Sequence, residues 1–467
     1  MMKPPLSTHV SVPSHGASRV SQVLGLIRDV DQFLEAGMID LGPVFSIRPL
    51  GVPEYVIVAD SDLVADLHKM PEGVLTDYPA NAFVEPLFGK NSVIFQDGED
   101  HVRTREALMR LFREIELTTY LEVLEEEIDK GIDELVTANG EQFDIELGEF
   151  FRGCFRRANV RIVFGRGDWG EFEEMTDHLL DSLSTVSDMF RHHWACSLRW
   201  TDSRRTRRDI DGLIREQWKK VRSGNHVAGS HTSAIELLAK AEASSPVFSL
   251  EALCDLLFSM FLTGYIPPGA TAAWSLGHIL EDAMVEREVF EEIESEGGRT
   301  PLLDSVFFEV LRWHNPLPFT SRTVARECEA GGRRWPVGTR FMISSFLIHR
   351  FDPMWDRADE FNAKRFQEIP MALSCRGFIP FGGGAHRCLG MHMAPVLNRH
   401  CLASFLSKTG SDLELLDSMA EGSRFYAGTA LPSGPIRVRV IVKKNVAKAS
   451  SDGTLGVVGG PGKEAGA

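Results

Sequence analysis

Apolar side chains recur at helical spacing along much of the chain. Residues 122–136 and 253–262 show this spacing clearly and predict long helices. Strand patterns are fewer and shorter. Residues 43–58 predict a hairpin around a Gly-Val-Pro turn, residues 337–347 are a second candidate strand, and residues 435–442 alternate between apolar and polar side chains. Long helices with a few short strands predict a mainly α fold with small β-sheets.

The two ends of the chain differ in composition from its middle. Residues 1–17 are rich in Pro, Ser and His and are predicted to be disordered, and residues 447–467 form a Gly- and Ala-rich tail that we expect to be flexible. No linker-like stretch or internal repeat interrupts residues 18–446. We therefore expect one large domain there, long enough to enclose a cofactor.

Charge and cysteine usage exclude some classes of protein. The net charge of −16 argues against nucleic-acid binding, which needs a basic face. The basic segment 191–222 predicts a solvated helix face with its loop or, as an alternative, a partner-docking patch. Seven scattered cysteines, an odd number, fit a reducing compartment. No apolar run reaches the roughly 18 residues that span a bilayer, and the N-terminus lacks a signal-peptide pattern, so we expect a cytoplasmic protein.

A glycine-rich loop around one cysteine is the most informative part of the sequence. Residues Phe381 to Gly390 read FGGGAHRCLG, with Gly382 among the three glycines before Cys388 and Gly390 after it. Glycines permit positive φ angles and let the backbone lie close to a flat ligand. Backbone N–H groups in such a turn can stabilise a thiolate, the form of cysteine that binds metal.

Three interpretations of this cysteine compete. Zinc could use Cys388 with His386 and His392, but the spacing is poor for structural zinc and a second cysteine pair is missing. A buried, inert thiol would not need glycines on both sides. A haem thiolate needs a single cysteine on a tight loop against the porphyrin, and this interpretation fits best.

The loop resembles the haem-binding loop of the cytochromes P-450, which reads Phe-Gly-x-Gly-x-His-x-Cys-x-Gly. Every named position of that pattern is matched here. The resemblance implies that Cys388 is the axial ligand of the haem iron, that Phe381 packs beside the sulfur and that His386 lies near a haem propionate. It extends over residues 44–442 and implies the family's mainly α fold and a haem b cofactor.

A second resemblance concerns the support of this loop. Glu309 and Arg312 are spaced i, i+3 on one face of a predicted helix, 79 residues before Cys388. They resemble the family's Glu-x-x-Arg pair, and Arg365 before Phe366 resembles its third partner. The resemblance implies a buried ionic network that anchors the cysteine loop. A surface ion pair is the alternative for Glu309 and Arg312.

Further cationic side chains match family positions that bind the propionates. Arg322 precedes Pro336-Val337-Gly338 at the spacing of the family's Arg…Pro-Ala-Gly hairpin. His101 and Arg105 are spaced i, i+4 and resemble the family's bacterial-type His-x-x-x-Arg. With His386, the resemblance implies a set of four propionate-binding residues. Each on its own would be explained by a surface salt bridge.

One stretch departs from the family pattern. The central helix of the family carries an acid–threonine pair that delivers protons for dioxygen activation. With Gly264 on the family's glycine and Tyr265 after it, the acid position holds Ile266 and the threonine position holds Pro267, followed by Pro268.

Neither Ile266 nor Pro267 can relay a proton, and consecutive prolines break a helix. The carbonyls of Thr263 and Gly264 would then face a cavity, where water or substrate satisfies them. An ordinary helix end, with a second helix starting near Pro268, is the alternative.

The resemblance implies a monooxygenase that acts on a small organic molecule and receives electrons from a ferredoxin-type partner. The missing acid–threonine pair leaves a second interpretation open: an isomerase, a dehydratase or a peroxide-using enzyme. A haem sensor is a third. The distal candidates are Gly264, Tyr265, Pro267 and Pro268. The sequence does not identify the substrate, whose pocket in the family is built from segments such as residues 77–92 and the region around Met189.

Overall fold

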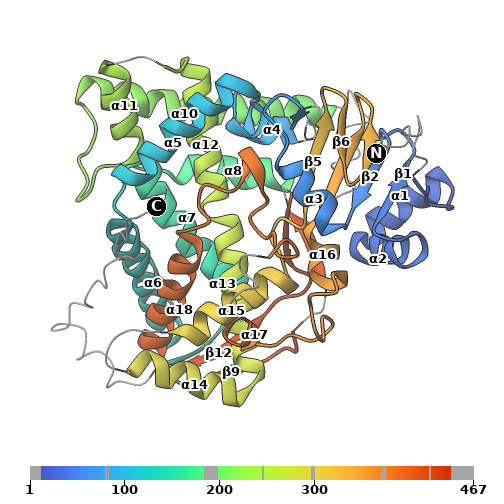
Figure 1. Ribbon diagram of the computed structural model, residues 1–467. Helices are drawn as coiled ribbons and strands as arrows, with labels where there is room; N and C mark the ends of the chain where they lie inside the picture. Colours follow the sequence, from blue (N-terminus) through green and yellow to red (C-terminus); the bar gives the residue numbers. More distant parts are fainter. Residues whose placement is uncertain are drawn as a thin grey trace, which may run out of the picture.

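Long helices make up most of the protein and surround one central helical segment (Figure 1). The computed structural model describes residues 12–78, 81, 84–182, 198–244, 247–295, 300–369, 375–419, 422–426 and 428–442. The mainly α fold with small sheets that the sequence predicts is confirmed.

The α-helices are α1 Arg19–Arg28, α2 Val30–Leu41, α3 Ser61–His68, α4 Glu85–Phe88, α5 Gly98–Glu114, α6 Leu117–Asn139, α7 Leu147–Phe164, α8 Gly170–Asp181, α10 Leu198–Ser223, α11 Ala234–Ser244, α12 Leu250–Thr263, α13 Ile266–Glu281, α14 Ala283–Glu294, α15 Pro301–Trp313, α16 Ser345–Phe351, α17 Arg365–Glu368 and α18 Ala394–Thr409. Short 3-10 helices are η2 Val93–Phe95 and η4 Gly384–His386.

The strands are β1 Val44–Ile47, β2 Tyr55–Val58, β3 Leu75–Thr76, β4 Gln142–Glu146, β5 Phe319–Val324, β6 Cys328–Ala330, β7 Arg333–Trp335, β8 Arg340–Ser344, β9 Leu413–Leu415, β10 Ser423–Tyr426, β11 Thr429–Pro432 and β12 Arg437–Ile441. They form a five-stranded sheet of order β1-β2-β8-β5-β3, the three-stranded sheet β4-β12-β9, and the pairs β6-β7 and β10-β11.

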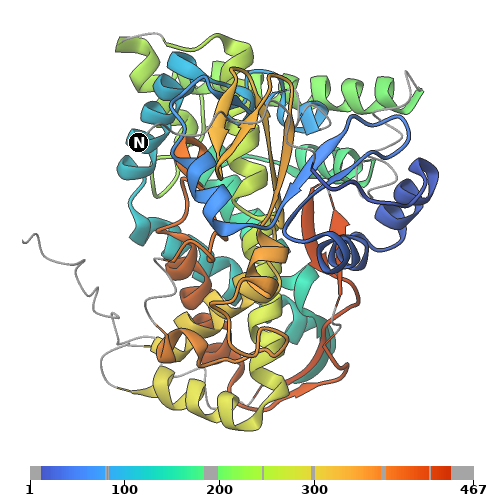
Figure 2. The ribbon, with the colours of Figure 1, turned by 45° about the vertical axis from the view of Figure 1, so that its right-hand side comes forward.

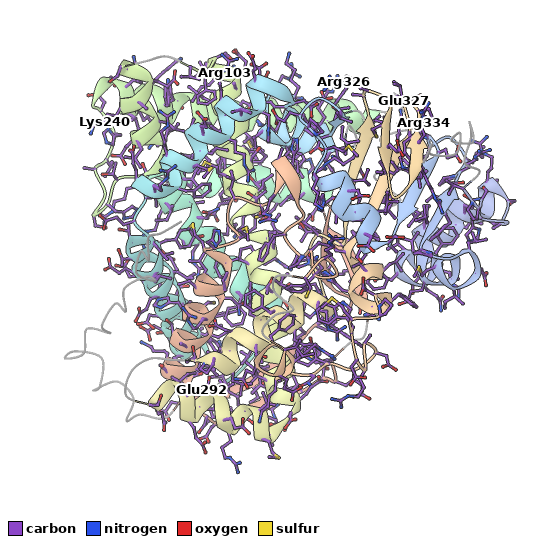
Figure 3. All side chains as sticks on the ribbon, in the orientation of Figure 1. Arg103, Lys240, Glu292, Arg326, Glu327 and Arg334 are labelled. Atoms are coloured by element: carbon purple, nitrogen blue, oxygen red, sulfur yellow. The ribbon has the colours of Figure 1, made fainter. Side chains whose placement is uncertain are left out.

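The helix α13 runs through the middle of the molecule, where α7, α15 and α18 pack around it (Figures 1 and 2). Side chains fill the space between these ribbons (Figure 3). Two of these helices approach closely at Gly269 of α13, where an added Cβ would lie 2.7 Å from the Arg152 backbone of α7. Glycine at this position lets two helices that bear the main apolar core pack closely.

The five-stranded sheet forms a second core on the other side of the molecule, covered by α1 and α2 (Figure 1). The hairpin expected in residues 43–58 is β1 paired antiparallel with β2, from Val44 opposite Val58 to Ile47 opposite Tyr55. Residues 435–442 contain β12, and the two expected helices lie within α6 and α12. These predictions are confirmed.

Three expectations need correction. Within residues 337–347 only Arg340–Ser344 is strand, and it ends there because the Ser344 side chain accepts a hydrogen bond from the Leu347 N–H and starts α16. Disorder does not extend to residues 12–17: the Ser46 N–H donates to Pro13 O at 2.7 Å and the His15 N–H to Ser46 O at 2.9 Å, which joins this segment to β1. Residues 1–11, 191–197 and 447–467 lie outside the described residues.

The third correction concerns apolar segments. Leu250–Glu281, which contains α12 and α13, is long and apolar enough to cross a membrane by length and composition. It is the one such segment among the described residues. Of its most apolar 18-residue stretch, 67% is buried inside the protein. The two consecutive helices of this segment lie in the core, and their apolar character comes from being surrounded by other helices.

Candidate cofactor-binding site

The Cys388 loop is a tight turn that precedes α18. Gly382 and Gly384 adopt φ angles of 65° and 67°, which side-chain-bearing residues rarely adopt. The Cys388 N–H donates to the Phe381 carbonyl at 3.0 Å and closes the loop. The Phe381 ring packs against the aromatic cluster that contains Phe378. The positive φ angles that the sequence predicts for the glycines of this loop are thus present at Gly382 and Gly384.

Two backbone N–H groups point at the Cys388 sulfur. They belong to Gly390 and Met391, and both lower the pKa of the thiol, as does the guanidinium of Arg105. Desolvation by the surrounding protein has the larger, opposite effect and raises this pKa above its ordinary value. As a whole residue, Cys388 is exposed to solvent. The loop therefore presents a thiol whose thiolate form already has three stabilising groups, as a metal-binding cysteine needs.

The zinc interpretation finds no support in the geometry. Among the residues that the structure describes, no three His, Cys, Asp or Glu side chains are grouped so that they could hold a metal ion. His386, one of the expected zinc ligands, turns to Asp77 instead, with 3.2 Å between its Nδ1 and Asp77 Oδ2. A cofactor that needs one protein ligand fits this donor set better than a bare cation does.

A buried ionic network lies beneath the loop. Glu309 accepts from Arg312 at 2.8 Å through both carboxylate oxygens, and Arg365 Nε lies 3.1 and 3.0 Å from the same two oxygens. The three side chains are 0–4% exposed. The remaining guanidinium N–H groups donate to backbone carbonyls of residues 349 and 356–360. The three residues that the sequence suggests as partners are thus brought together with their donors satisfied.

This network is joined to the cysteine loop by residues that sequence reasoning missed. His349, whose carbonyl accepts from Arg312, uses its Nε2 to accept the Ile379 N–H at 3.0 Å. Trp355 Nε1 donates to the Gly377 carbonyl at 3.2 Å. These contacts hold the chain just before Phe381. Their signal in the sequence is weak, because one histidine and one tryptophan near an arginine carry no pattern.

The four candidates for propionate binding meet at the edge of the loop. The His101 and His386 rings stack with centroids 4.0 Å apart, and Arg322 Nη1 lies 2.6 Å from Asp77 Oδ1, next to His386. Arg105 donates to the Arg387 carbonyl at 2.6 Å. His101 and Arg105 lie on α5, and Arg103 between them points outward to solvent (Figure 3).

Burial controls the charge of the two histidines. Desolvation, with Arg322, His101 and Arg105 nearby, lowers the pKa of His386 to about 2, and desolvation also lowers the pKa of His101. Both rings are therefore neutral near pH 7 and act as hydrogen-bonding groups. Arg322 and Arg105 supply the positive charge of this cluster.

The distal candidates lie where α12 ends and α13 begins. Thr263 is the last residue of α12, Gly264 and Tyr265 connect the helices, and Pro267 and Pro268 occupy the second and third positions of α13. The prolines are therefore not inside a continuous helix. They occupy a first turn, where the missing N–H groups would have no helical partner. The alternative of an ordinary helix end describes this region better than a proline-broken helix does.

The expectation that the Gly264 carbonyl faces a cavity is wrong. The Tyr120 hydroxyl donates to this carbonyl, with 3.4 Å between the two oxygens. Asn159 Nδ2 donates to the carbonyls of Met260 and Phe261 at 3.2 and 2.7 Å and so satisfies the end of α12. A Cβ at Gly264 would lie 2.3 Å from Asn159 Nδ2, so glycine is needed for this contact. Side chains from α6 and α7 thus hydrogen-bond the carbonyls of Met260, Phe261 and Gly264, while Thr263 is exposed to solvent.

Replacing Glu309 with Ala should leave Arg312 and Arg365 buried without a carboxylate. We expect a loss of about 3–5 kcal/mol in the free energy of unfolding and mostly insoluble or cofactor-free protein, measured by soluble yield, denaturant unfolding and haem content. Arg312→Ala should behave similarly. Glu134→Ala, which removes one partner of the exposed Lys130–Glu134 pair, should change stability by less than about 1 kcal/mol. Normal stability and haem content in both anchor variants would contradict this account.

Comparisons with known proteins agree with this geometry. The sequence pattern that defines the cytochrome P450 family matches residues 28–412. Putative cytochrome P-450 137 of Mycobacterium tuberculosis is 24% identical over 76% of this chain and 74% of its own. Cytochrome P-450 71D94 of Mentha gracilis is 24% identical over 88% of this chain and 87% of its own.

The fold comparison covers nearly the whole chain. The solved structure of a retinoic acid-bound cyanobacterial relative, CYP120A1, superimposes with a TM-score of 0.74 at 20% identity, over 92% of this chain and 98% of that one. The family match spans far more than half of the sequence and includes the Cys388 loop. The chain belongs to the cytochrome P-450 family of haem-thiolate oxidoreductases.

Proposed function

We propose that this protein is a monooxygenase that binds haem b through the Cys388 thiolate and oxidises a small organic molecule. The observation that carries the proposal is the Cys388 loop, in which the sulfur receives two backbone N–H groups and the chain before it is held by a buried ionic network. Such a loop presents one thiolate in a fixed position. A haem-thiolate centre requires this of its protein.

The residues at the edge of the loop fit the other end of the cofactor. Haem b carries two propionates, and the cluster offers two guanidinium groups and two neutral imidazole rings from α5, β5 and η4. A carboxylate of the chain, Asp77, already lies between Arg322 and His386, which shows that this pair can receive a carboxylate. We therefore assign Arg322, His386, His101 and Arg105 to the propionates, with Gly382 and Gly390 shaping the loop.

When bound, the thiolate-ligated haem supplies the activation of dioxygen that inserts one oxygen atom into a substrate. The electrons must come from outside the described fold, and we propose a ferredoxin-type donor in the cytoplasm. The chain itself holds the thiolate, neutralises the propionates and shapes the distal side through α12 and α13. The names of the mycobacterial and mint relatives state no substrate, so no substrate is assigned from them.

A second candidate function rests on the start of α13. Ile266 is buried and Pro267 carries no exchangeable proton, so the two positions of the family's acid–threonine pair offer no acid or alcohol for proton delivery. The Tyr120 hydroxyl, which lies behind the break, is committed to Gly264 and Asn159. An enzyme that uses hydrogen peroxide, or that rearranges or dehydrates an already oxidised substrate, would not need the missing pair.

Reduced protein exposed to carbon monoxide should show the red-shifted Soret band of a thiolate-ligated haem. Cys388→Ala should abolish the band because it removes the sulfur ligand. Cys375→Ala and Cys401→Ala are the matched controls and should keep it, since both thiols lie outside the loop. Persistence of the band in Cys388→Ala would overturn the assignment of the ligand.

The two candidate functions differ in how the enzyme obtains protons and oxygen. With a ferredoxin system, the native enzyme should couple nicotinamide oxidation to product only on substrates with an exchangeable hydroxyl or amine proton, or should work better with peroxide. Ile266→Asp combined with Pro267→Thr should raise coupling several-fold, because both positions then carry a proton-transferring group.

Pro267→Thr alone is the control for the double variant and should change little, because position 266 still lacks an acid. The measurement is the ratio of product formed to nicotinamide consumed, with and without peroxide. Tight coupling by the native enzyme on a substrate without any exchangeable proton, and without peroxide, would contradict this interpretation of the distal side.

A further inference from the structure

Asp77 is a buried carboxylate placed opposite one of the assigned propionate ligands. The strand β3 pairs antiparallel with β5, with Leu75 opposite Val324 and Thr76 opposite Thr323, so that the next position brings Asp77 to Arg322. Asp77 Oδ1 lies 2.6 Å from Arg322 Nη1 and its Oδ2 lies 3.2 Å from His386 Nδ1. The residue is 4% exposed. Arg322 and His386, which we assign to a propionate, therefore already contact a carboxylate of the chain itself.

The charged groups around Asp77 come from every element packed against it. Arg322 is on β5, His386 on η4 and His101 on α5. Asp97 Oδ1, just before α5, lies 3.8 Å from His386 Nε2, and Glu72 Oε1 lies 3.1 Å from His101 Nδ1. The remaining neighbours in this cluster are His68, Arg105 and Arg387.

The charge of this cluster is balanced before any cofactor enters it. Three arginines in the cluster face three acidic side chains: Arg105, Arg322 and Arg387, and Glu72, Asp77 and Asp97. Burial with nearby arginines lowers the pKa of His68 to about 4, so the His68 ring is neutral near pH 7, as are those of His101 and His386. Two propionates would add two negative charges at a largely buried place. Such an excess is costly unless one of the acids is neutralised.

Asp77 cannot easily leave the cluster with its backbone. The β3–β5 pairing fixes the residues before it, and the Asn81 N–H donates to the Asp77 carbonyl at 3.1 Å. Asn81 Nδ2 in turn donates to the Ser321 carbonyl beside Arg322. Burial raises the pKa of Asp77 to about 7, with Arg322 opposing this rise and Asp97 adding to it. Protonation of this carboxylate therefore requires little additional free energy near neutral pH.

We propose that Asp77 takes up one proton from solvent when haem binds and donates a hydrogen bond to a propionate, which then receives Arg322 and His386. The inference rests on the proposed haem site and adds a residue that neither the sequence nor the family pattern assigns. The only bond formed within the protein is the O–H bond of the Asp77 carboxyl group, whose proton comes from solvent, and nothing is oxidised or reduced. The carboxylate goes from an ionised partner of the arginine to a neutral donor for the cofactor.

If Asp77 gains a proton when haem binds, the affinity for haem must depend on pH. The propionates disfavour the ionised form of Asp77, so its pKa is higher in the haem-bound protein than in the haem-free protein. Haem binding is then favoured at low pH and loses this contribution as pH rises above about 7. A proton released by the Cys388 thiol on ligation has the opposite sign, so wild type and variant must be compared at each pH.

The test compares wild type with Asp77→Asn, a neutral donor of similar shape. Asp62→Asn, at an exposed carboxylate paired with Arg376, is the matched control. Haem transfer from each holoprotein to an excess of apomyoglobin is timed between pH 6 and 9. The ratio of haem retention in wild type to that in Asp77→Asn should fall by up to about tenfold per pH unit above pH 7, as for one linked proton. Asp62→Asn should follow wild type.

A second readout detects the proton directly. The infrared spectrum of the wild-type holoprotein at pH 8 should contain the carbonyl stretch of a protonated carboxyl group that shifts in D₂O, and Asp77→Asn should lack this band. Absence of the band in wild type, or a pH-independent retention ratio, would show that Asp77 stays ionised and would overturn the proposal. Failure of both Asp77→Asn and Asp77→Ser to hold haem at any pH would also overturn it, because a neutral donor should favour haem.

The experiments distinguish failure of this role of Asp77 from failure of the proposed function. Asp77→Asn keeps Cys388, so its reduced carbon monoxide complex should retain the band of a thiolate-ligated haem. If wild type itself lacks that band, the haem-thiolate proposal fails. If wild type has the band and the proton signals are missing, the role of Asp77 alone fails.

Discussion

The buried carboxylate of Glu309 is the interaction on which the rest of the site depends. An ionised carboxylate in the core is tolerated only when its charge and its lone pairs are satisfied, and here two arginines from α15 and α17 satisfy them. The guanidinium groups need acceptors in turn, and they find these in the backbone carbonyls of the segment around residues 356–360. One buried charge thereby fixes the course of a long irregular segment.

That segment positions the cysteine loop. Arg312 holds the His349 carbonyl, His349 holds the Ile379 N–H, and the loop with Cys388 begins two residues later. Phe378, packed between Trp355 and Phe366, supports the same point with apolar contacts. The thiol is therefore placed by a hydrogen-bonded path from the core, and its electrostatics are set locally by the N–H groups of Gly390 and Met391. Loss of the network would displace the ligand without touching it.

Much of this arrangement could be predicted from the sequence because it depends on local patterns. Glycines that adopt positive φ, a Glu and an Arg three residues apart on a helix, and a histidine and an arginine one turn apart are all visible along the chain. The structure brings Glu309 to Arg365 and His101 to His386, as the family resemblance implies. The alternating strand and the early hairpin were equally readable from side-chain periodicity.

The rest depends on partners that are distant in the sequence. Asp77 meets Arg322 only because β3 pairs with β5, and Tyr120 of α6 meets Gly264 only because α6 and α12 both pack against α7. No spacing rule connects these positions. The double proline misled for a related reason: a proline pair predicts a break, but where the chain turns is decided by Asn159, which satisfies the end of α12. Likewise, Ser344 ended an expected strand by capping a helix.

The central claim is that the Cys388 sulfur is the protein ligand of the haem iron. X-ray absorption at the iron edge of the ferric holoprotein tests it directly, with wild type beside Cys388→Ser. The account predicts one sulfur in the first coordination shell of the wild-type iron and none in the variant. A wild-type iron without sulfur, or a variant that keeps it, would contradict the account.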